Sequence, residues 1–574
     1  MHVDYLMAVR TPAPLRKRCA RAPLAAAVAL CLAGSAQAAT ITVNDSRGDP
    51  ANPNDSTCSL ADAVAAVNQA AQFGGCAAGD GNNDRIVLSF GTATTIQFAL
   101  PSPSDNNSAL SITKPVSIVG AVDANHNPLI TLTRSTVSGT PAFRLIGTAG
   151  NLSLDGIALT NGSASESGGA VRATGYATVS VSNSQVNANT AVVSGGGVAV
   201  DCGALTLYRS TVSGNSAGKS GGGLYVSDYL KTSSGSTTCS STMNINRSTV
   251  SNNTAAVGSG GGAFSFNGDA TVTGSTISGN TTQVNGGGIY AYQSVTLSAS
   301  TVSNNTGQSG GGGGVWSYDV STTGTSSFVS GNTTVHGGGG IFAYTANLSG
   351  ITVSNNKSTY DGGGIQVQND ATLANSTIAN NATGYCECRA TGGMSANAMT
   401  VTNSTFTGNF GGYFGYGALY AKDVTLYFNT IVGNTAMPVN TRAGGVAFFN
   451  SANMVSNIIS GNSSNDVYTY PTRAVTGGYN IITRVGFATL PADTITSCSP
   501  SSNLNLGPLA YNGGATQTMA LLDGSCAIDA GPDATPLPGG VTSDQRGLLR
   551  PYGVRADIGA YELQPDVIFA DGFQ

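Results

Sequence analysis

Residues 275–305 read STISGNTTQVNGGGIYAYQSVTLSASTVSNN and contain one full period of a pattern that recurs along the chain. The pattern is Ser-Thr-apolar-x-x-Asn, followed about ten residues later by a Gly run and an apolar residue. The Asn of the pattern occurs at Asn189, Asn215, Asn253, Asn280, Asn305, Asn332, Asn356, Asn381, Asn409, Asn434 and Asn462. The last Gly of each run falls at Gly169, Gly197, Gly223, Gly262, Gly288, Gly314, Gly340, Gly364, Gly393, Gly417 and Gly445. Most steps in both series span 24 to 29 residues, which indicates a repeat protein.

The repeat predicts an all-β fold, a right-handed parallel β-helix with one coil per repeat. Its β-branched residues alternate with period two, as in short strands, and no unit has room for a helix. Stacked coils place each Asn over its counterpart, so the side-chain amides can form a ladder, and Asn also tolerates the left-handed conformation. Gly allows positive φ and a close approach of neighbouring coils. A β-propeller is the alternative, although its blades usually need about 40 to 50 residues.

Composition supports this class and excludes others. The chain has 574 residues, of which 78 are Gly, and only 9% are charged. Gly, Ser, Thr and Asn are poor helix formers, while 40% hydrophobic residues suffice to build a core. Because the sequence pI is 5.2 and Lys and Arg are scattered, we expect no nucleic-acid partner.

The N-terminal residues 1–38 are typical of a secretory signal peptide. A basic stretch at residues 16–21 precedes an apolar stretch at residues 22–33, and Ala36-Gln37-Ala38 has the form of a cleavage site. We therefore expect the mature chain to begin at Ala39, with its formal net charge changed from −5 to −9. No later stretch is long and apolar enough for a transmembrane helix, so the predicted location is extracellular or on the outer cell surface.

Eight cysteines remain after this cleavage, and in an exported protein they predict disulfides. Eight cysteines allow 105 connectivities, and we expect the couples that are local in sequence. The pairing of the fourth couple stays open, because it is either a strained local disulfide or two free thiols, too few for a zinc site. The couples are Cys58 with Cys76, Cys202 with Cys239, Cys498 with Cys526, and Cys386 with Cys388.

The ends of a β-helix need caps, because an open coil exposes unpaired strand edges. Residues 59–70 are the one good helix candidate, with Ser59 as N-cap and Asp62 completing a capping box. The sequence thus divides into a signal peptide (1–38), an N-terminal cap with the first strands (39–109), the repeats (110–480) and a C-terminal cap and tail (481–574).

Two segments resemble known bacterial exported proteins. Residues 58–64, Cys-Ser-Leu-Ala-Asp-Ala-Val, resemble the motif of CSLREA-domain proteins, with Ala61 in place of Arg and Asp62 in place of Glu. Residues 506–509, 512–514, 527–531, 544–547 and 557–562 resemble, in order, the motifs of a choice-of-anchor Q domain. The Gly-Gly-Ile and Phe406-x-x-Asn409 pieces are similar to polymorphic outer-membrane proteins. The resemblance implies a secreted or surface β-helix protein and implies no established catalytic site.

The strands after the Gly runs carry the candidate binding site. Their first and third residues are aliphatic or small and are expected to point inward, so the second and fourth point outward. The second residues are Tyr225, Phe264, Tyr290, Trp316 and Phe342, and the fourth are Phe266, Tyr292, Tyr318 and Tyr344. Such a stripe suits a polysaccharide or a surface protein as partner. The alternative is that the rings stack on one another as a structural feature.

An enzyme of the polysaccharide lyase or glycoside hydrolase class is the alternative hypothesis. It would need convergent carboxylates or a Lys or Arg base, and no two acidic residues of the repeats occupy one slot in adjacent coils. The D-x-N-x-D spacing of Asp80, Asn82 and Asp84 lacks the Gly and Glu of a calcium loop. We expect no catalytic residue, no metal and no cofactor, and expect Asp544, Arg546, Asp557 and Glu562 to form ion pairs within the C-terminal cap.

The sequence thus predicts a secreted or cell-surface binding protein, adhesive or polysaccharide-binding, that uses the aromatic stripe. A polysaccharide-degrading enzyme and a structural spacer of the cell surface remain the alternatives.

Overall fold

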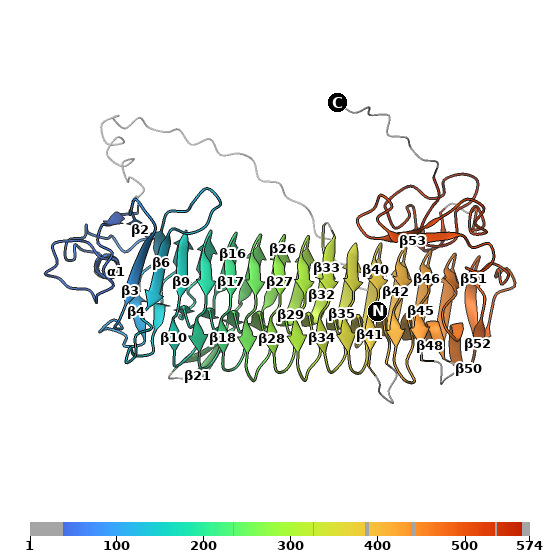
Figure 1. The fold of residues 1–574 in the computed structure, drawn as a ribbon, viewed down its shortest axis with the longest axis horizontal. Helices are drawn as coiled ribbons and strands as arrows, with labels where there is room; N and C mark the ends of the chain where they lie inside the picture. Colours follow the sequence, from blue (N-terminus) through green and yellow to red (C-terminus); the bar gives the residue numbers. More distant parts are fainter. Residues whose placement is uncertain are drawn as a thin grey trace, which may run out of the picture. The chain divides into compact units, whose positions relative to one another are not determined.

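Each repeat of the sequence forms one coil of a right-handed parallel β-helix, so the predicted fold class is confirmed (Figure 1). The computed structural model describes residues 38–564 except 233–234, 325, 385–389, 438–441 and 534–535, and it leaves out the side chains of residues 229–238. Residues 1–38 and 39–574 are separate units, and the description that follows concerns the second. Apart from Ala38, the predicted signal peptide lies outside the described residues.

Three parallel sheets run along the solenoid, and sheet one contains the aromatic residues. It has 24 strands within the described residues. They are β1 (Thr40–Val43), β2 (Asp84–Leu88), β4 (Ser108–Ile112), β5 (Val116–Val119), β7 (Arg144–Thr148), β8 (Leu152–Asp155), β11 (Val171–Ala173), β12 (Val179–Ser182), β15 (Val198–Asp201), β16 (Ala204–Tyr208), β19 (Leu224–Ser227), β22 (Thr242–Asn246), β25 (Ala263–Phe266), β26 (Asp269–Thr273), β29 (Ile289–Ser298), β32 (Val315–Thr322), β35 (Ile341–Ser349), β38 (Ile365–Val367), β39 (Asp370–Ala374), β42 (Met394–Thr402), β45 (Leu419–Tyr427), β48 (Ala443–Val455), β50 (Asn465–Gly478) and β52 (Val485–Thr489).

Sheets two and three take their strands in sequence order, one from each coil. Sheet two consists of β3 (Thr94–Phe98), β6 (Ile130–Arg134), β9 (Ile157–Thr160), β13 (Gln185–Asn187), β17 (Thr211–Ser213), β23 (Thr249–Ser251), β27 (Thr276–Ser278), β30 (Thr301–Ser303), β33 (Ser327–Ser330), β36 (Ile351–Ser354), β40 (Thr377–Ala379), β43 (Thr405–Thr407), β46 (Thr430–Val432), β49 (Ile458–Ser460) and β51 (Ile481–Ile482). Sheet three consists of β10 (Ser163–Ala164), β14 (Thr190–Ala191), β18 (Ser216–Ala217), β24 (Thr254–Ala255), β28 (Thr281–Thr282), β31 (Thr306–Gly307), β34 (Thr333–Thr334), β37 (Lys357–Ser358), β41 (Ala382–Thr383), β44 (Phe410–Gly411) and β47 (Thr435–Ala436).

The predicted Asn ladder exists and is buried between sheets two and three. From Asn189 to Asn462, each side-chain amide donates to the Oδ1 of the next ladder Asn, at 2.9–3.0 Å. The ladder ends where Asn462 donates to the carboxylate of Asp466. The left-handed residue is the one before each ladder Asn, for example Gly279 at φ 64° and Asn304 at φ 54°.

The Gly runs are needed at the corner that leads into sheet one. Most runs contain one Gly with positive φ, as at Gly286 with φ 64°. A Cβ on the next residue, Gly287, would lie 2.3 Å from the carbonyl oxygen of Gly313 in the following coil. Any larger residue there would push the coils apart, so both predicted uses of Gly are confirmed.

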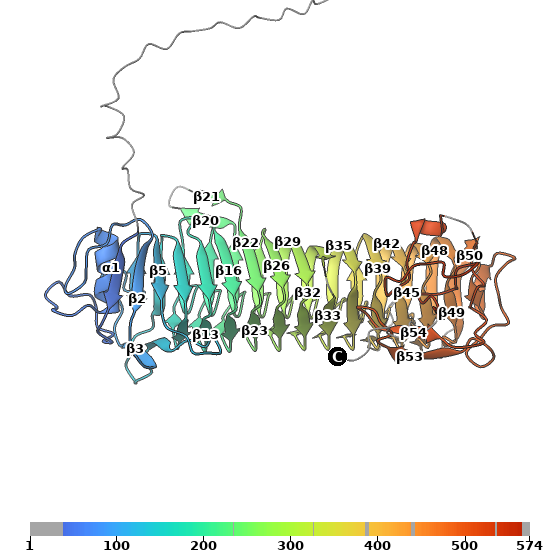
Figure 2. The ribbon, with the colours of Figure 1, turned by 90° about the horizontal axis from the view of Figure 1, so that it is seen from above.

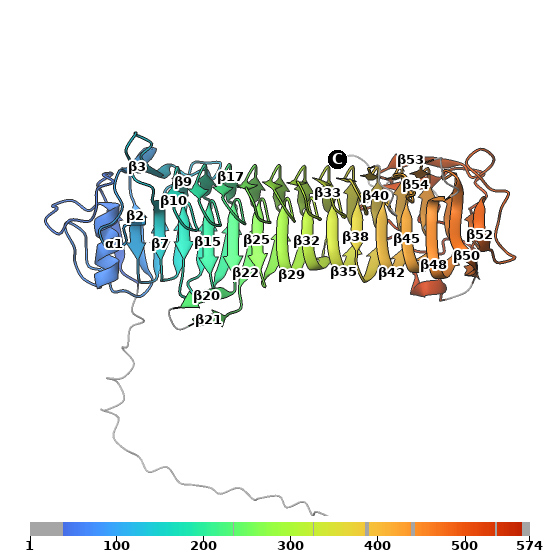
Figure 3. The ribbon, with the colours of Figure 1, turned by 90° about the horizontal axis from the view of Figure 1, so that it is seen from below.

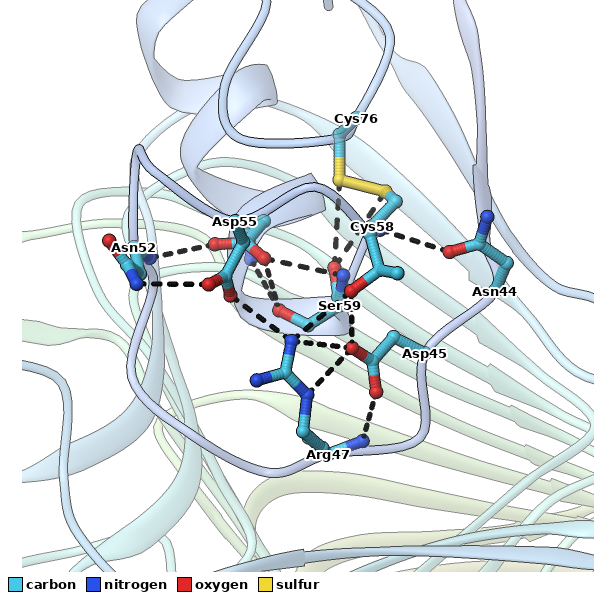
Figure 4. The surroundings of a disulfide bond; sticks show 10 residues. Asn44, Asp45, Arg47, Asn52, Asp55, Cys58, Ser59 and Cys76 are labelled. Carbon is cyan, nitrogen blue, oxygen red and sulfur yellow. Dashed lines mark hydrogen bonds and ion pairs between the residues drawn. A yellow bond between two sulfur atoms is a disulfide. The ribbon is translucent and has the colours of Figure 1, made fainter.

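The predicted helix caps the N-terminal end. Helix α1 (Leu60–Gln69) begins after Ser59, and the capping box with Asp62 is present. Its apolar face is buried against β1, β2 and β4. Figure 4 shows the Cys58–Cys76 disulfide beside this N-cap, next to Arg47, which bridges Asp45 and Asp55.

The C-terminal segment folds back along the outer face of sheet two. Thr377 donates to the carbonyl of Gln517, and Asn403 donates to the carbonyl of Ser543, at 2.6 and 2.7 Å. This segment includes the antiparallel pair β53 (Leu506–Ala510) and β54 (Thr518–Leu521) and the short 3-10 helix η1 (Pro538–Gly540). Figures 1 and 2 show it alongside β40, β46 and β49, where it covers the side of the last coils.

Three of the four predicted disulfides are present: Cys58–Cys76, Cys202–Cys239 and Cys498–Cys526. Cys202–Cys239 ties down the base of an inserted hairpin, β20 (Tyr229–Thr232) and β21 (Gly235–Thr238), which projects beside β15 and β22 (Figure 3). Cys386 and Cys388 lie outside the described residues.

Removing one ladder amide should destabilise the solenoid. In Asn305→Ala, the carbonyl of Ile277 and the backbone N–H of Asn280 each lose a buried hydrogen-bond partner, at about 1–3 kcal/mol each. We expect the free energy of unfolding in urea to fall by about 3 kcal/mol. Asn347→Ala, an exposed position of β35, should change it by less than about 0.5 kcal/mol. Equal effects of the two substitutions would contradict a structural role of the ladder.

Candidate functional site

The predicted inward and outward directions in sheet one are confirmed. In the five coils that carry the aromatic residues, the first and third residues after the Gly runs, such as Ile289 and Ala291, are at most 1% exposed. The aromatic residues therefore lie on the outer face, and strand register places them in two adjacent columns that cross the coils. The inner column is Tyr225, Phe264, Tyr290, Trp316 and Phe342. The outer column is Phe266, Tyr292, Tyr318 and Tyr344.

Rings of the inner column stack face to face. Successive centroids lie 5.4, 4.9, 4.4 and 5.9 Å apart, and the planes are within 6° of parallel. Phe264 and Trp316 are only 8% and 9% exposed, and burial raises the pKa of Tyr290 to about 12. Both faces of Phe264, Tyr290 and Trp316 are therefore covered by neighbouring rings, and only the ring edges can contact solvent. The inner column thus packs as a structural ladder.

The outer column is accessible. Phe266, Tyr292 and Tyr318 are 37–40% exposed. Neighbouring planes are tilted by 38° and 53° between Phe266, Tyr292 and Tyr318, while Tyr318 and Tyr344 stack at 4.3 Å. Tilted rings keep part of their faces free for a ligand. The structure thus brings the nine predicted residues together in two columns. The four rings of the outer column are the more accessible, and the five rings of the inner column pack on one another.

A groove of about 650 Å³ runs along sheet one from the coil of Asp319 to the coil of Thr476, so it begins in the coils of Tyr318 and Tyr344 and continues past the C-terminal end of the outer column. It is lined by Asp319, Asp370 and Asp423 and by polar residues such as Thr372 and Asn453. None of the described residues that line it is Lys, Arg or His. Its polar floor follows one column of the register: Asn347, Thr372, Thr400, Thr425, Asn453 and Thr476. Thr271, Thr296 and Ser321 continue the same column N-terminal to the groove.

A second column, which we call the aspartate row, forms the edge of this groove from Asp319 onward. In coil order it consists of Asp269, Ser294, Asp319, Thr345, Asp370, Ala398, Asp423 and Ser451. The prediction that no two acidic residues share a slot in adjacent coils holds for this row, since each Asp is followed by Ser, Thr or Ala. The sequence did not reveal that four Asp share a slot in alternate coils.

The row was missed because its distance from the Gly run varies. Asp269 is seven residues after Gly262, whereas Asp319 is five residues after Gly314. The bend between the two halves of each strand absorbs the difference, and a register shift at Ala291 marks it in β29. Counting back from the Ser-Thr-apolar motif, rather than forward from Gly, would have aligned most of these carboxylates.

Other candidate residues have structural roles. Asp84 accepts hydrogen bonds from the backbone of Asp80 and Gly81, and the His336 ring stacks on Tyr360 at 4.9 Å. Among the residues that the structure describes, no three metal-ligating side chains gather. In the same part of the chain, no helix is long and apolar enough to cross a membrane.

The charges of the C-terminal cap form a buried network, and two of the expected ion pairs are present. Arg546 pairs with Asp544 at 2.7 Å, and Arg550 pairs with Glu562 at 3.0 Å, where both side chains are inaccessible to solvent. Asp557 accepts instead from the backbone of Asp529 and Leu563. Arg550 also lies over the Phe428 ring, so the network attaches the cap to the solenoid.

Comparison with known proteins supports the fold. Residues 262–436, which include most of the aromatic columns, match the family described as right handed beta helix region. No curated protein matches the chain. The crystal structure of pectate lyase Pel9A aligns over 91% of this chain and 96% of that chain, at 14% identity and a TM-score of 0.19. At that score the likeness supports no argument about activity.

Substitutions in the two columns should separate structure from surface. Trp316→Ala removes a buried ring stacked on both sides, so we expect the unfolding free energy to fall by about 3–5 kcal/mol. Tyr318→Ala, at 40% exposure, should cost about 1 kcal/mol or less. Far-UV circular dichroism during urea unfolding measures both. A similar loss in both variants would show that the outer column is also structural.

The C-terminal network should make stability depend on pH. Burial raises the pKa of Glu562 from 4.5 to about 7. The folded protein therefore holds this proton more tightly than the unfolded chain, so the contribution is complete below pH 4.5 and is lost as pH rises through about 7. Calorimetry should show the unfolding free energy falling by about 3 kcal/mol across this window.

Glu562→Gln should flatten this pH dependence, because the amide group has no proton to release in this window. Glu166→Gln, at a half-exposed carboxyl group, is the control and should keep the slope. If the unfolding free energy of Glu562→Gln still falls with pH across this window, the pH dependence arises from other groups.

Proposed function

We propose that this protein is an exported binding protein that holds an extended polysaccharide along the outer face of sheet one. The observation that supports the proposal best is the exposed outer column, whose C-terminal end meets a groove with a floor of Thr and Asn side chains. Tilted aromatic rings offer faces to sugar rings, while hydroxyl and amide groups match sugar hydroxyls. Both features repeat at about 4.8 Å along the solenoid axis, so the ligand would lie along that axis.

The arrangement of acidic groups favours binding over hydrolysis. Carboxylates of the aspartate row are two coils apart, about 9.6 Å, which is well beyond the roughly 5–5.5 Å of retaining glycosidases and at the upper limit of the range of about 6.5–9.5 Å for inverting ones. They also lie in line along the groove rather than on opposite sides of it. A polysaccharide-degrading enzyme remains the second hypothesis that the experiment below must exclude.

Export is part of the same proposal. Three disulfides are compatible with an oxidising compartment, and residues 1–38 resemble a signal peptide. The CSLREA-like and choice-of-anchor Q-like segments support a place among bacterial surface or secreted proteins. In this structure the first forms the capped helix end, and the second forms the cap that covers the side of the last coils.

Affinity electrophoresis of residues 39–574 through gels that contain different polysaccharides tests the proposal. Tyr292→Ala/Tyr318→Ala should lose retardation, whereas Tyr511→Ala, a tyrosine 58% exposed on the C-terminal segment, should keep it. Clearing of the polymer around the band would replace the proposal with an enzyme. Absence of retardation on all polymers, or equal retardation of both variants, would contradict a glycan-binding outer column.

A further inference from the structure

The aspartate row has a period of two coils. Asp269, Asp319, Asp370 and Asp423 alternate with Ser294, Thr345, Ala398 and Ser451. Carboxylates in adjacent coils would be about 4.8 Å apart and would repel one another, so interleaving keeps them about 9.6 Å apart. The groove edge is therefore a line of negative charges with a fixed two-coil repeat.

Three of the four carboxylates in the row accept a hydrogen bond from the hydroxyl group of the residue that follows in the next coil. Ser294 donates to Asp269 at 2.6 Å, Thr345 donates to Asp319 at 2.7 Å, and Ser451 donates to Asp423 at 2.6 Å. Asp370 is followed by Ala398, which has no hydroxyl, and it accepts no hydrogen bond from any described side chain. An exposed carboxylate without a donor thus lies in the middle of the groove.

A second acidic group points to a ligand at the N-terminal end of the row. Asp228 and Asp269 line a hollow of about 610 Å³. Asp228 is only 6% exposed, and its Oδ1 has no hydrogen-bond partner among the described residues. A buried carboxylate oxygen without a donor is costly, so a donor supplied by a ligand would stabilise it.

Few cations oppose these charges along the groove. Among the described lining residues of the groove and the hollow, none is basic. Lys422 precedes Asp423 and is exposed, but it does not line the groove. A polyanion such as polygalacturonate would be repelled here, whereas a ligand with positive charges at a regular spacing would be attracted.

We propose that the groove binds a cationic amino-sugar polymer, a linear glycan with free amino groups, whose two-sugar repeat follows the two-coil repeat of the aspartate row. The inference rests on the proposed function and names the charge class of its ligand. An extended peptide presents same-face side chains every two residues, about 6.8 Å apart, which does not match about 9.6 Å. The exposed rings and the polar floor also suit sugar rings with hydroxyl groups.

Isothermal titration calorimetry at about pH 6 tests the proposal with four ligands. Three are sugar hexamers, made of β-1,4-linked glucosamine, of N-acetylglucosamine and of galacturonate, and the fourth is a lysine hexamer. Residues 39–574 should bind the glucosamine hexamer most tightly. Raising the ionic strength to about 1 M, where the screening length is about 3 Å, should weaken this binding. Galacturonate should not bind.

The decisive variant is Asp319→Asn/Asp370→Asn/Asp423→Asn, which keeps the shape of the row and removes its charge. Its affinity for the glucosamine hexamer should fall about ten-fold. Asp49→Asn/Asp523→Asn/Asp533→Asn changes the net charge equally at exposed positions elsewhere and should bind as the wild type does. Both triple variants should unfold at the wild-type temperature, because all six positions are at least partly solvent-exposed.

The remaining outcomes separate the two proposals. Equal binding of the glucosamine and N-acetylglucosamine hexamers would overturn the cationic assignment and leave polysaccharide binding intact. Lysine hexamer bound as tightly as glucosamine hexamer, with the same loss in the row variant, would make the occupant a basic peptide and overturn the glycan. No binding of any sugar hexamer would contradict both proposals.

Discussion

Stacking of each residue on its counterpart in the next coil is the constraint on which the structure depends. At a spacing of about 4.8 Å, a side chain is tolerated only if it can lie next to a similar one. A buried Asn meets this condition, because its amide group both donates and accepts and can be repeated without leaving an orphan. The ladder ends where Asn462 donates to Asp466, because a carboxylate accepts hydrogen bonds but has no N–H to donate to a further residue.

The same constraint shapes the outer surface. Aromatic rings repeat well because they stack, and the inner column does so from Tyr225 to Phe342. Carboxylates repeat poorly because like charges repel, and the aspartate row therefore places a hydroxyl group or Ala398 between them. The surface of the solenoid is a set of parallel columns, each with its own chemistry and its own period, which makes it suited to ligands that are themselves linear and periodic.

The nine aromatic residues illustrate how two interpretations of one stripe can both apply. The inner column has the stacked geometry expected of a structural feature, and its ring faces are in contact with one another. In the outer column, Phe266, Tyr292 and Tyr318 are exposed and tilted relative to one another, and the groove begins in the coils of Tyr318 and Tyr344. The proposed binding surface thus rests on Tyr292 and Tyr318 and on the polar residues beside them more than on Trp316, the one tryptophan of the chain.

The sequence alone was sufficient for the features that arise from local, repeated patterns. It identified the coil, the ladder from Asn189 to Asn462, the capped helix after Ser59, three disulfides and the outward direction of the aromatic residues, because period-two alternation and capping chemistry act over a few residues. Only the tertiary structure revealed the aspartate row and the return of the C-terminal segment over sheet two. The row depends on register across a bend of variable length, and the return joins residues about 140 positions apart, as in the bond from Thr377 to Gln517. The row emerges from the sequence only when the coils are aligned on the Ser-Thr-apolar motif instead of the Gly run, and the return has no sequence signal, because in both cases the position of a residue is set by the coils it packs against rather than by its neighbours along the chain.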